Sequence, residues 1–240
     1  MNVQTTESAQ GARPSRLVSL PVLEPADCDV YWEALQEVRA SWTARHPLAP
    51  FFTLGAASYL DAGEEYQALA AAANPVLASR FASLLERVRQ AIAAHTGDPV
   101  EVGRFALPGF HIFQAHPAFE RPVASIHCDL QFQGLAWGSG ADLNRTLTFT
   151  LPIRLPATGG GLDAWDIETA EWMPLSPSER LALLKARAYT YFPYECGRIE
   201  LHDGQFVHRI AASRGMAPGE ERVTYHGHGV WEDGAWRLYW

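Results

Sequence analysis

His127 and Asp129 are separated by one residue, Cys128, in the stretch 125–132, where β-branched and aromatic residues alternate with polar ones. This alternation predicts a strand. Side chains two apart on a strand project from the same face, so His127 and Asp129 would point together while Cys128 points away. An imidazole beside a carboxylate supplies two ligands of a 2-His-1-carboxylate centre, which suits non-haem Fe(II). A His-x-Asp pair alone is more often a hydrogen-bonded pair on an ordinary strand.

A third candidate ligand, His208, lies in a later alternating segment, residues 198–211, that is divided by an Asp-Gly turn. Another alternating strand, residues 221–225, carries Arg222, and Gly215 stands midway between His208 and Arg222. A hairpin centred on Gly215 would place His208 and Arg222 opposite each other on one face of a sheet. A guanidinium fixed beside a metal suits the far carboxylate of a chelating co-substrate.

With these residues in place, the chain resembles the Fe(II)/2-oxoglutarate-dependent oxygenases over residues 100–240. The matching motifs are His127-x-Asp129, then His208 four residues after a glycine, then Arg222-x-Thr224. Arg222 follows His208 by fourteen residues. The family motif is Arg-x-Ser, so this chain departs from it by having Thr224 in place of the serine.

The resemblance implies a role for each of these residues. His127, Asp129 and His208 would bind Fe(II), and Arg222 and Thr224 would bind 2-oxoglutarate. O2 would complete the set, and a C–H bond of a small molecule, such as an amino acid or a natural-product intermediate, would be hydroxylated or otherwise oxidised. Because Asp129 fills the third ligand position, no position is vacated for halide, and hydroxylation is favoured over halogenation.

The pattern of the chain predicts a mostly β fold with flanking helices, arranged as a barrel or a double-sheet jelly roll, and the resemblance implies that this is a double-stranded β-helix (a jelly-roll, cupin-like barrel). From residue 100 onward the hydrophobic period is two, in short segments separated by turn signals and without βαβ alternation. We expect one domain over residues 17–240, with helical support at 17–99 packed on one face of a barrel core at 100–240. The polar residues 1–16 are predicted to be a disordered lead-in.

Individual elements follow from the same patterns. Helices are predicted at residues 27–42, 64–73 and 75–95. In the strand 145–151, threonines alternate with leucine and phenylalanine, so the threonines share one face. An Asp-Gly turn near the C-terminus, at residues 233–234, predicts a terminal hairpin.

Composition restricts the class of protein. The 240 residues are 48% hydrophobic, which is enough for one buried core. The net charge is −8 and Lys185 is the one lysine, so a nucleic-acid surface is disfavoured. Three cysteines, an odd number, indicate a reducing cytoplasm. We see no apolar run of the roughly 20 residues that span a bilayer, and no signal-peptide core, so no membrane is expected.

Substrate contacts are expected from the segment before the metal motif, from a tryptophan-containing loop and from a strand after three glycines. The candidates are His111, Phe113, Trp137, Asp163, Trp165 and His226. His226 and His228 share the face of Arg222 by strand parity. His202, at the end of a strand before a turn, is expected to be solvated.

Three alternatives remain open from the residues alone. A three-histidine, cupin-type iron site could recruit His111 or His202 in place of Asp129, but it would leave Arg222 without a role. A jelly-roll module could bind a sugar or peptide with its tryptophans. An iron oxygenase could also work without 2-oxoglutarate. The sequence does not indicate the oligomeric state.

Overall fold

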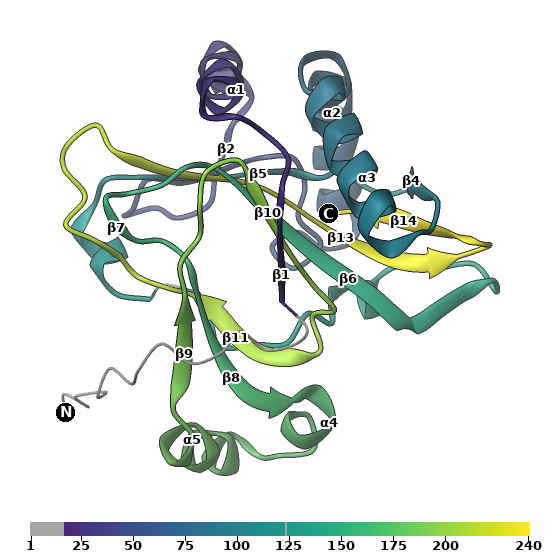
Figure 1. Cartoon of the computed structure of the whole chain (residues 1–240), viewed down its shortest axis with the longest axis vertical. Helices are drawn as coiled ribbons and strands as arrows, with labels where there is room; N and C mark the ends of the chain where they lie inside the picture. Colours follow the sequence, from purple (N-terminus) through teal and green to yellow (C-terminus); the bar gives the residue numbers. More distant parts are fainter. Residues whose placement is uncertain (1–16, 123) are drawn as a thin grey trace.

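The structure, a computed structural model, describes residues 17–122 and 124–240. These residues form a nine-stranded sheet, a three-stranded sheet, a two-stranded pair and five α-helices (Figure 1). The prediction of a mostly β fold with flanking helices is therefore confirmed. The predicted lead-in, residues 1–16, lies outside the described residues.

The nine-stranded sheet is centred on its two longest strands, β6 (Ala141–Arg154) and β13 (Glu221–Glu232), which pair antiparallel. The strand order is β1-β10-β6-β13-β5-β3-β2, and β14 and β4 continue the sheet beside the second half of β13. Only the β14–β4 pairing is parallel among the described residues. The other strands of this sheet are β1 (Val18–Pro21), β2 (Thr43–Ala44), β3 (Phe51–Leu54), β4 (Val100–Val102), β5 (Gly109–Gln114), β10 (Arg198–His202) and β14 (Ala235–Tyr239).

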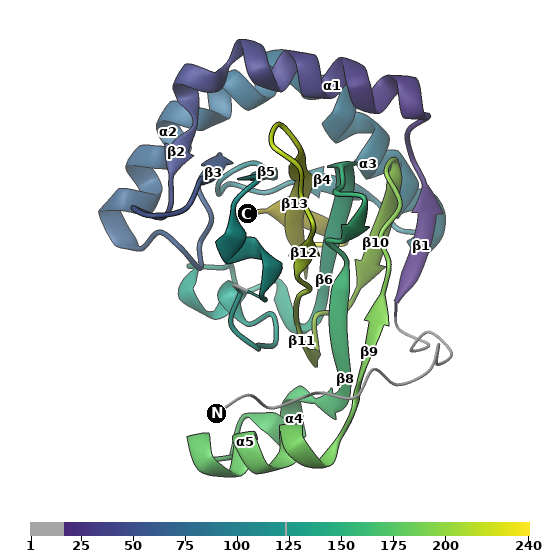
Figure 2. The same cartoon turned by 90° about the vertical axis from the view of Figure 1, so that its left-hand side faces the viewer.

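The three-stranded sheet has the order β11-β8-β9, and its side chains line a cavity together with side chains of the large sheet. Figure 2 shows β8 and β9 running from the level of β6 down to α4 and α5. The strands of the smaller sheets are β8 (Leu162–Glu168), β9 (Tyr189–Phe192), β11 (Phe206–Ile210), and the pair β7 (Thr158–Gly159) and β12 (Ser213–Arg214).

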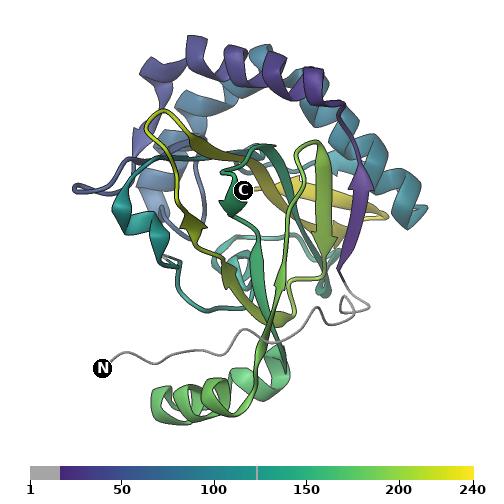
Figure 3. The ribbon, with the colours of Figure 1, turned by 60° about the vertical axis from the view of Figure 1, so that its left-hand side comes forward.

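The helices lie at two places. α1 (Pro25–Glu37), α2 (Gly63–Arg80) and α3 (Ala82–Thr96) cover the outer face of the large sheet, whereas α4 (Thr169–Trp172) and α5 (Pro177–Ala186) lie at the far end of β8 and β9 (Figure 3). Single turns of 3-10 helix occur at Arg39–Ser41, Pro117–Glu120 and Gln131–Gly134. No single helix among the described residues is long and apolar enough to cross a bilayer; α2 and α3 pass that test only as a pair bent by 85°.

Alternation along β6 gives the large sheet one apolar and one polar face. Leu147, Phe149 and Leu151 are buried in the main core with side chains of α1 and α3. Thr148 and Thr150, on the other face, line the cavity, as the period-two pattern predicts. The helices thus seal one side of the sheet and leave the other side for a polar site.

The predicted helix break at Pro75 is wrong. α2 continues through Pro75 to Arg80, and the break falls at Phe81. Leu77 and Phe81 are 3% and 1% exposed, so burial in the main core keeps the chain helical despite the hydrogen bond lost at the proline. The first helix ends at Glu37, short of the predicted residue 42.

Two predictions about strands near the site are also wrong. Residues 125–132 form no strand: His127 makes an isolated bridge with His208. The hairpin centred on Gly215 does not form, because β11 pairs with β8 while β13 pairs with β5, β6 and β14. His208 and Arg222 therefore reach the same cavity from different sheets.

Candidate metal centre

Three side chains that are able to bind a metal converge on the cavity wall. His127, Asp129 and His208 each offer one ligand atom, and these atoms lie within 4.8 Å of one another. Nε2 of each histidine is 3.5 Å from Oδ1 of Asp129. Across residues 17–122 and 124–240, no second group of three or more His, Cys, Asp or Glu side chains meets this geometry. The three residues singled out in the sequence are thus brought together.

Backbone hydrogen bonds hold the loop of His127 against β11. The N–H of His127 donates to the carbonyl of His208 at 3.0 Å, and the N–H of His208 donates back at 2.9 Å. Two residues on, the N–H of Asp129 donates to the carbonyl of Gly204. Gly204 has φ +71°, and a Cβ there would lie 2.7 Å from Cβ of Asp129, so a glycine is required.

Both histidines present the same ring nitrogen to the centre. Nδ1 of His127 is 2.8 Å from the carbonyl oxygen of Ser125, and Nδ1 of His208 is 2.9 Å from that of Phe206. A carbonyl only accepts, so each Nδ1 carries the proton and donates it. Each Nε2 points toward Oδ1 of Asp129, and once it gives up its proton it offers the lone pair that a metal ion needs.

Asp129 is buried yet ionised. Burial by itself would raise the pKa of Asp129, but the charge of His208 and hydrogen bonds from His127 and His208 hold that pKa well below its usual range. Its other oxygen, Oδ2, accepts a 2.7 Å hydrogen bond from the Thr148 hydroxyl. A metal ion would take the place of the protons shared between Oδ1 and the two imidazoles.

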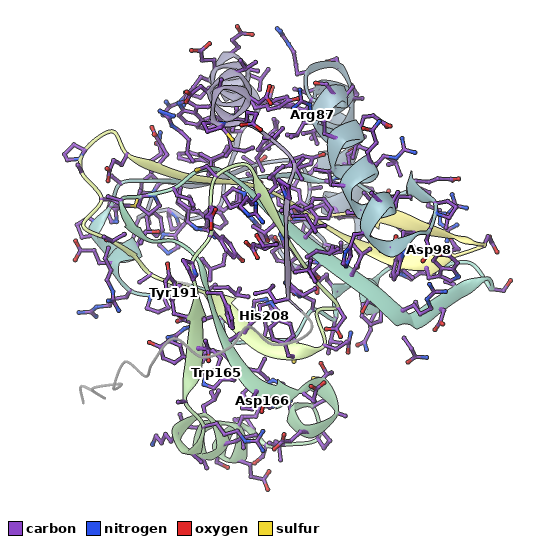
Figure 4. All side chains as sticks on the ribbon, viewed as in Figure 1. Arg87, Asp98, Trp165, Asp166, Tyr191 and His208 are labelled. Atoms are coloured by element: carbon purple, nitrogen blue, oxygen red, sulfur yellow. The ribbon has the colours of Figure 1, made fainter. Side chains whose placement is uncertain are left out.

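The triad lines a cavity of about 810 Å³, a size typical of small-molecule sites. Aromatic side chains form part of its wall, and the rings of Phe51 and Phe113 stack 4.3 Å apart there. In Figure 4, His208 lies near the centre of the molecule, above Trp165 and Asp166 of β8. The cavity therefore has one wall that carries the His-Asp-His group and one wall that is apolar.

Arg222 is a buried cation in the same cavity. The residue is 2% exposed, and its Nε donates to the carbonyl of Gly160 at 2.8 Å. Its Nη1 is buried without a hydrogen-bond partner among the described residues. Burial lowers the pKa of Arg222 to about 10, so the side chain is charged at neutral pH. A buried guanidinium with an unused donor is a site for an anion.

The predicted substrate residues divide into two groups. His111, Phe113 and His226 line the cavity, as does Thr224 beside Arg222. Trp137, Asp163 and Trp165 lie outside the described cavity lining: the Trp137 indole donates to the carbonyl of Phe132, Asp163 pairs with Arg209 at 2.9 Å, and Trp165 packs with Cys128 in a separate apolar cluster. Cys128 packs in that apolar cluster but also contributes to the cavity lining, so its predicted orientation away from the triad is met only in part.

His202 is not solvated as expected. It is 5% exposed, lines the cavity, and its ring centroid is 5.3 Å from that of His208. Its Nδ1 accepts the N–H of Gly204. The turn that follows β10 folds back over this ring, and burial lowers the pKa of His202 to about 3.

Three residues of the site were missed in the sequence, namely Tyr59, Gln131 and Thr148, and His228 was placed on the correct face but not among the substrate contacts. The Tyr59 hydroxyl lies 2.6 Å from Nε2 of His111, and Gln131 and Thr148 contact Asp129 or His228. The polar face of β6 was a signal for Thr148 and strand parity was one for His228. Tyr59 follows a short strand in a loop, and no local pattern marks it.

Sequence comparison with known family models and with curated proteins finds no match. The fold, in contrast, is similar to solved structures. An N-substituted L-amino acid dioxygenase from Burkholderia ambifaria AMMD, in complex with alpha-ketoglutarate, is 14% identical with TM-score 0.55, covering 93% of this chain and 86% of that chain. HygX from Streptomyces hygroscopicus, with nickel, 2-oxoglutarate and hygromycin B bound, is 14% identical with TM-score 0.52, covering 88% and 82%.

A third similar structure is the non-heme alpha-ketoglutarate-dependent carbocyclase SnoK from nogalamycin biosynthesis. It is 14% identical with TM-score 0.51, and the match covers 89% of this chain and 78% of that one. At this identity the likeness establishes the fold. The chain therefore has the fold of 2-oxoglutarate-dependent oxygenases, and the resemblance inferred from its motifs is confirmed at that level.

Proposed function

We propose that the protein is a non-haem Fe(II)- and 2-oxoglutarate-dependent oxygenase that hydroxylates or otherwise oxidises a C–H bond of a small molecule. The observation that carries this proposal is one cavity that contains both a His-Asp-His group and a buried arginine with an unused donor. In this proposal the two sheets form the double-stranded β-helix typical of such enzymes, with the site between them.

The donor set fits ferrous iron. Two imidazole nitrogens and one carboxylate oxygen converge from one side, which is the facial arrangement that leaves positions open for other ligands. Both histidines are already oriented by backbone carbonyls. Iron bound here, with 2-oxoglutarate and O2, would supply the oxidising chemistry.

The surroundings of Arg222 fit the far carboxylate of 2-oxoglutarate. Its Nη1 lacks a partner, and the Thr224 hydroxyl belongs to the same strand and the same cavity. A charge-assisted hydrogen bond to a buried carboxylate is worth about 1.5–3 kcal/mol. Phe113 and Tyr194, whose ring centroids are 5.5 and 6.0 Å from the guanidinium carbon, exclude water and strengthen that contact.

The substrate is proposed to contact His111, Phe113 and His226, with Tyr59 added by the structure. Burial lowers the pKa of His111 to about 3 and holds the pKa of His226 well below its usual range, so both rings are neutral. Arg45, also on the wall, forms an ion pair with Asp61. This wall favours a largely uncharged part of an amino acid or natural-product intermediate. Free cysteines at positions 28, 128 and 196 are consistent with action in the cytoplasm.

The alternatives raised by the sequence are less well supported. His111 and His202 lie outside the group whose ligand atoms converge, so a three-histidine centre has less geometric support than the triad. An iron oxygenase without 2-oxoglutarate, or a sugar-binding module, would leave the buried Arg222 without a purpose.

The test is production of succinate from 2-oxoglutarate in air. The protein with Fe(II) should convert 2-oxoglutarate slowly alone and faster with a substrate drawn from a panel of amino acids and polyketide or aminoglycoside intermediates. The His208→Ala variant should form none above the protein-free background. Equal succinate formation by parent and His208→Ala would reject the proposal.

A further inference from the structure

Behind Asp129, side chains of β6 and β13 form a continuous chain of hydrogen bonds. Oγ1 of Thr148 lies 2.7 Å from Oδ2 of Asp129 and 3.0 Å from Nδ1 of His228. Nε2 of His228 is 3.2 Å from Nε2 of His226, whose Nδ1 is 3.0 Å from Oγ1 of Thr150. The register of the two strands explains the contacts, because His228 is opposite Thr148 and His226 is opposite Thr150.

The direction of every bond follows from the chemistry of the end group. An ionised carboxylate only accepts, so the single hydroxyl proton of Thr148 is donated to Asp129. Nδ1 of His228 must then carry a proton and donate to Thr148. A neutral His228 has no second proton, so its Nε2 accepts from Nε2–H of His226, and Nδ1 of His226 accepts from the Thr150 hydroxyl.

Burial favours the neutral imidazoles that this chain of hydrogen bonds requires. His228 is 2% exposed, and burial lowers its pKa to about 4. The amide nitrogen of Gln131 lies 2.6 Å from Nε2 of His228 and 3.4 Å from Oδ1 of Asp129, so it shares the single Nε2 lone pair with His226. Each member has one proton to give, so the loss of one member leaves two neighbours without a partner.

We propose that Thr148, His228 and His226 are positioning residues that fix the rotation of the Asp129 carboxylate. With Oδ2 engaged by Thr148, Oδ1 is the oxygen held 3.5 Å from both imidazole Nε2 atoms and is the one presented to the metal. The inference rests on the proposed metal site, and it adds that metal affinity is controlled from the interior of the sheet. Removing a partner of this kind typically costs 10- to 100-fold in metal affinity, on the order found for other metal centres.

The first test is a titration with Co(II), followed through the visible absorption of the bound ion. Thr148→Val keeps the shape of the side chain and removes the donor, so its Co(II) dissociation constant should rise about 10- to 100-fold. Thr148→Ser restores the hydroxyl and should return the constant to within about threefold of the parent. Thr146→Val is the matched control: Thr146 lies on the same face of β6, but its hydroxyl donates to the carbonyl of Asp203.

The possible results separate this inference from the proposed function. If the parent binds Co(II) and Thr148→Val binds it equally well, the positioning role is rejected and the metal site stands. If Thr146→Val weakens binding as much as Thr148→Val, the effect is one of strand stability and the positioning role is again rejected. A parent that binds no Co(II) would overturn the metal site and this inference together.

The second test needs no substitution at the site. In the diamagnetic Zn(II)-loaded protein, two-dimensional 15N NMR of the imidazoles should show His228 as the Nδ1–H tautomer and His226 as the Nε2–H tautomer. The opposite tautomer at His228 would mean that Thr148 donates to His228 rather than to Asp129. That result would reject the proposed chain of hydrogen bonds. This NMR measurement tests the inference even if Thr148→Val does not fold.

Discussion

At the scale of single residues, the guanidinium of Arg222 gives the strongest support to the proposal that the cavity binds an anion. A buried charge costs several kcal/mol, on the order of the effective penalty for an ion in a protein interior, unless it is paired. Arg222 has a backbone carbonyl on Nε and aromatic rings beside it, and Nη1 has no partner among the described residues. The triad alone would explain a metal site, whereas Arg222 explains why a dicarboxylate would bind next to it.

Replacing Arg222 should separate binding of the co-substrate from binding of the metal. Arg222→Ala should raise the 2-oxoglutarate dissociation constant about 10- to 100-fold, which corresponds to 1.5–3 kcal/mol. Arg222→Lys should recover part of the loss, because an ammonium lacks the fork of donors. Isothermal titration of the Co(II)-loaded protein with 2-oxoglutarate measures the co-substrate constant. Titration of the metal-free protein with Co(II) measures the metal constant, which should match that of the parent.

One control variant completes the experiment. Arg209→Ala is a control on a different arginine, since Arg209 pairs with Asp163 outside the cavity lining, and it should bind 2-oxoglutarate as the parent does. Unchanged 2-oxoglutarate affinity in Arg222→Ala would show that the anion binds elsewhere.

The residues of the candidate metal site were accessible from the sequence because short spacing and strand parity constrain them. His127 and Asp129 are two apart, so any extended segment projects them together. Trp137 and Asp163 were not accessible in this way. Whether a loop or strand faces a cavity depends on which strands pair, and that pairing is set by contacts distant in the sequence.

At the scale of elements, the turn between β10 and β11 determines where the candidate metal ligands meet. Gly204 has φ +71° in this turn, and its carbonyl accepts the N–H of Asp129. The turn therefore connects the strand of His208 to the loop of Asp129. The isolated bridge between His127 and His208 completes the connection.

Gly204→Ala should damage the metal centre, because the new Cβ would lie 2.7 Å from Asp129 Cβ and 3.1 Å from the Thr148 hydroxyl. We expect at least a tenfold loss of Co(II) affinity, together with a loss of about 1–3 kcal/mol of stability from backbone strain and crowding. Chemical denaturation and Co(II) titration measure the two effects.

Gly215→Ala provides the control for strain alone. Gly215 has φ +63°, and a Cβ there meets nothing within 4 Å. This variant should lose stability by about 1 kcal/mol and keep the parent's Co(II) affinity. An equal loss of Co(II) affinity in both variants would mean that general strain, rather than contact with Asp129, weakens the site.

The arrangement of strands was only partly predictable. The prediction of the terminal hairpin was correct because an Asp-Gly turn fixes this hairpin locally. Asp233 and Gly234, between β13 and β14, have φ 50° and 80°. The predicted hairpin centred on Gly215 was wrong because the segment before Gly215, β12, pairs with the distant β7 rather than with β13. β11 instead pairs with β8, which precedes it by about forty residues in the chain.

At the scale of the whole molecule, the helices seal the outer face of the large sheet and the histidines gather on the inner face. His111, His202 and His228 are at most 6% exposed. Burial lowers the pKa of His111 and of His202 to about 3 and that of His228 to about 4. The folded protein thus keeps several imidazoles neutral where the unfolded chain would protonate them.

Stability should therefore fall as the pH falls below 6.5. Between about pH 4 and 6.5 the unfolded state binds more protons than the folded state, so the free energy of unfolding rises with pH in this range. The low pKa of Asp129 acts in the same direction but at lower pH, below its usual value of 3.8. Urea unfolding of the metal-free protein at pH 4.5 to 7.5 measures the slope.

His111→Phe tests the assignment of that slope. His111 packs beside Phe51 and Phe113, so phenylalanine suits the site. Loss of one titrating group should reduce the slope by about 1.4 kcal/mol per pH unit between pH 4.5 and 6, the value for one proton. A slope identical to that of the parent would show that His111 titrates normally in the folded state.

The most direct measurement of the central claim is an anaerobic titration of the protein with Fe(II) and 2-oxoglutarate, followed by visible absorption. Chelation of protein-bound Fe(II) by a keto acid should give a charge-transfer band that requires protein, Fe(II) and 2-oxoglutarate together. His208→Ala should show no band, and Arg222→Ala should show the parent's band only at about 10- to 100-fold higher 2-oxoglutarate. If the parent binds Fe(II) and no band appears at any concentration of 2-oxoglutarate, the protein is not a 2-oxoglutarate-dependent oxygenase.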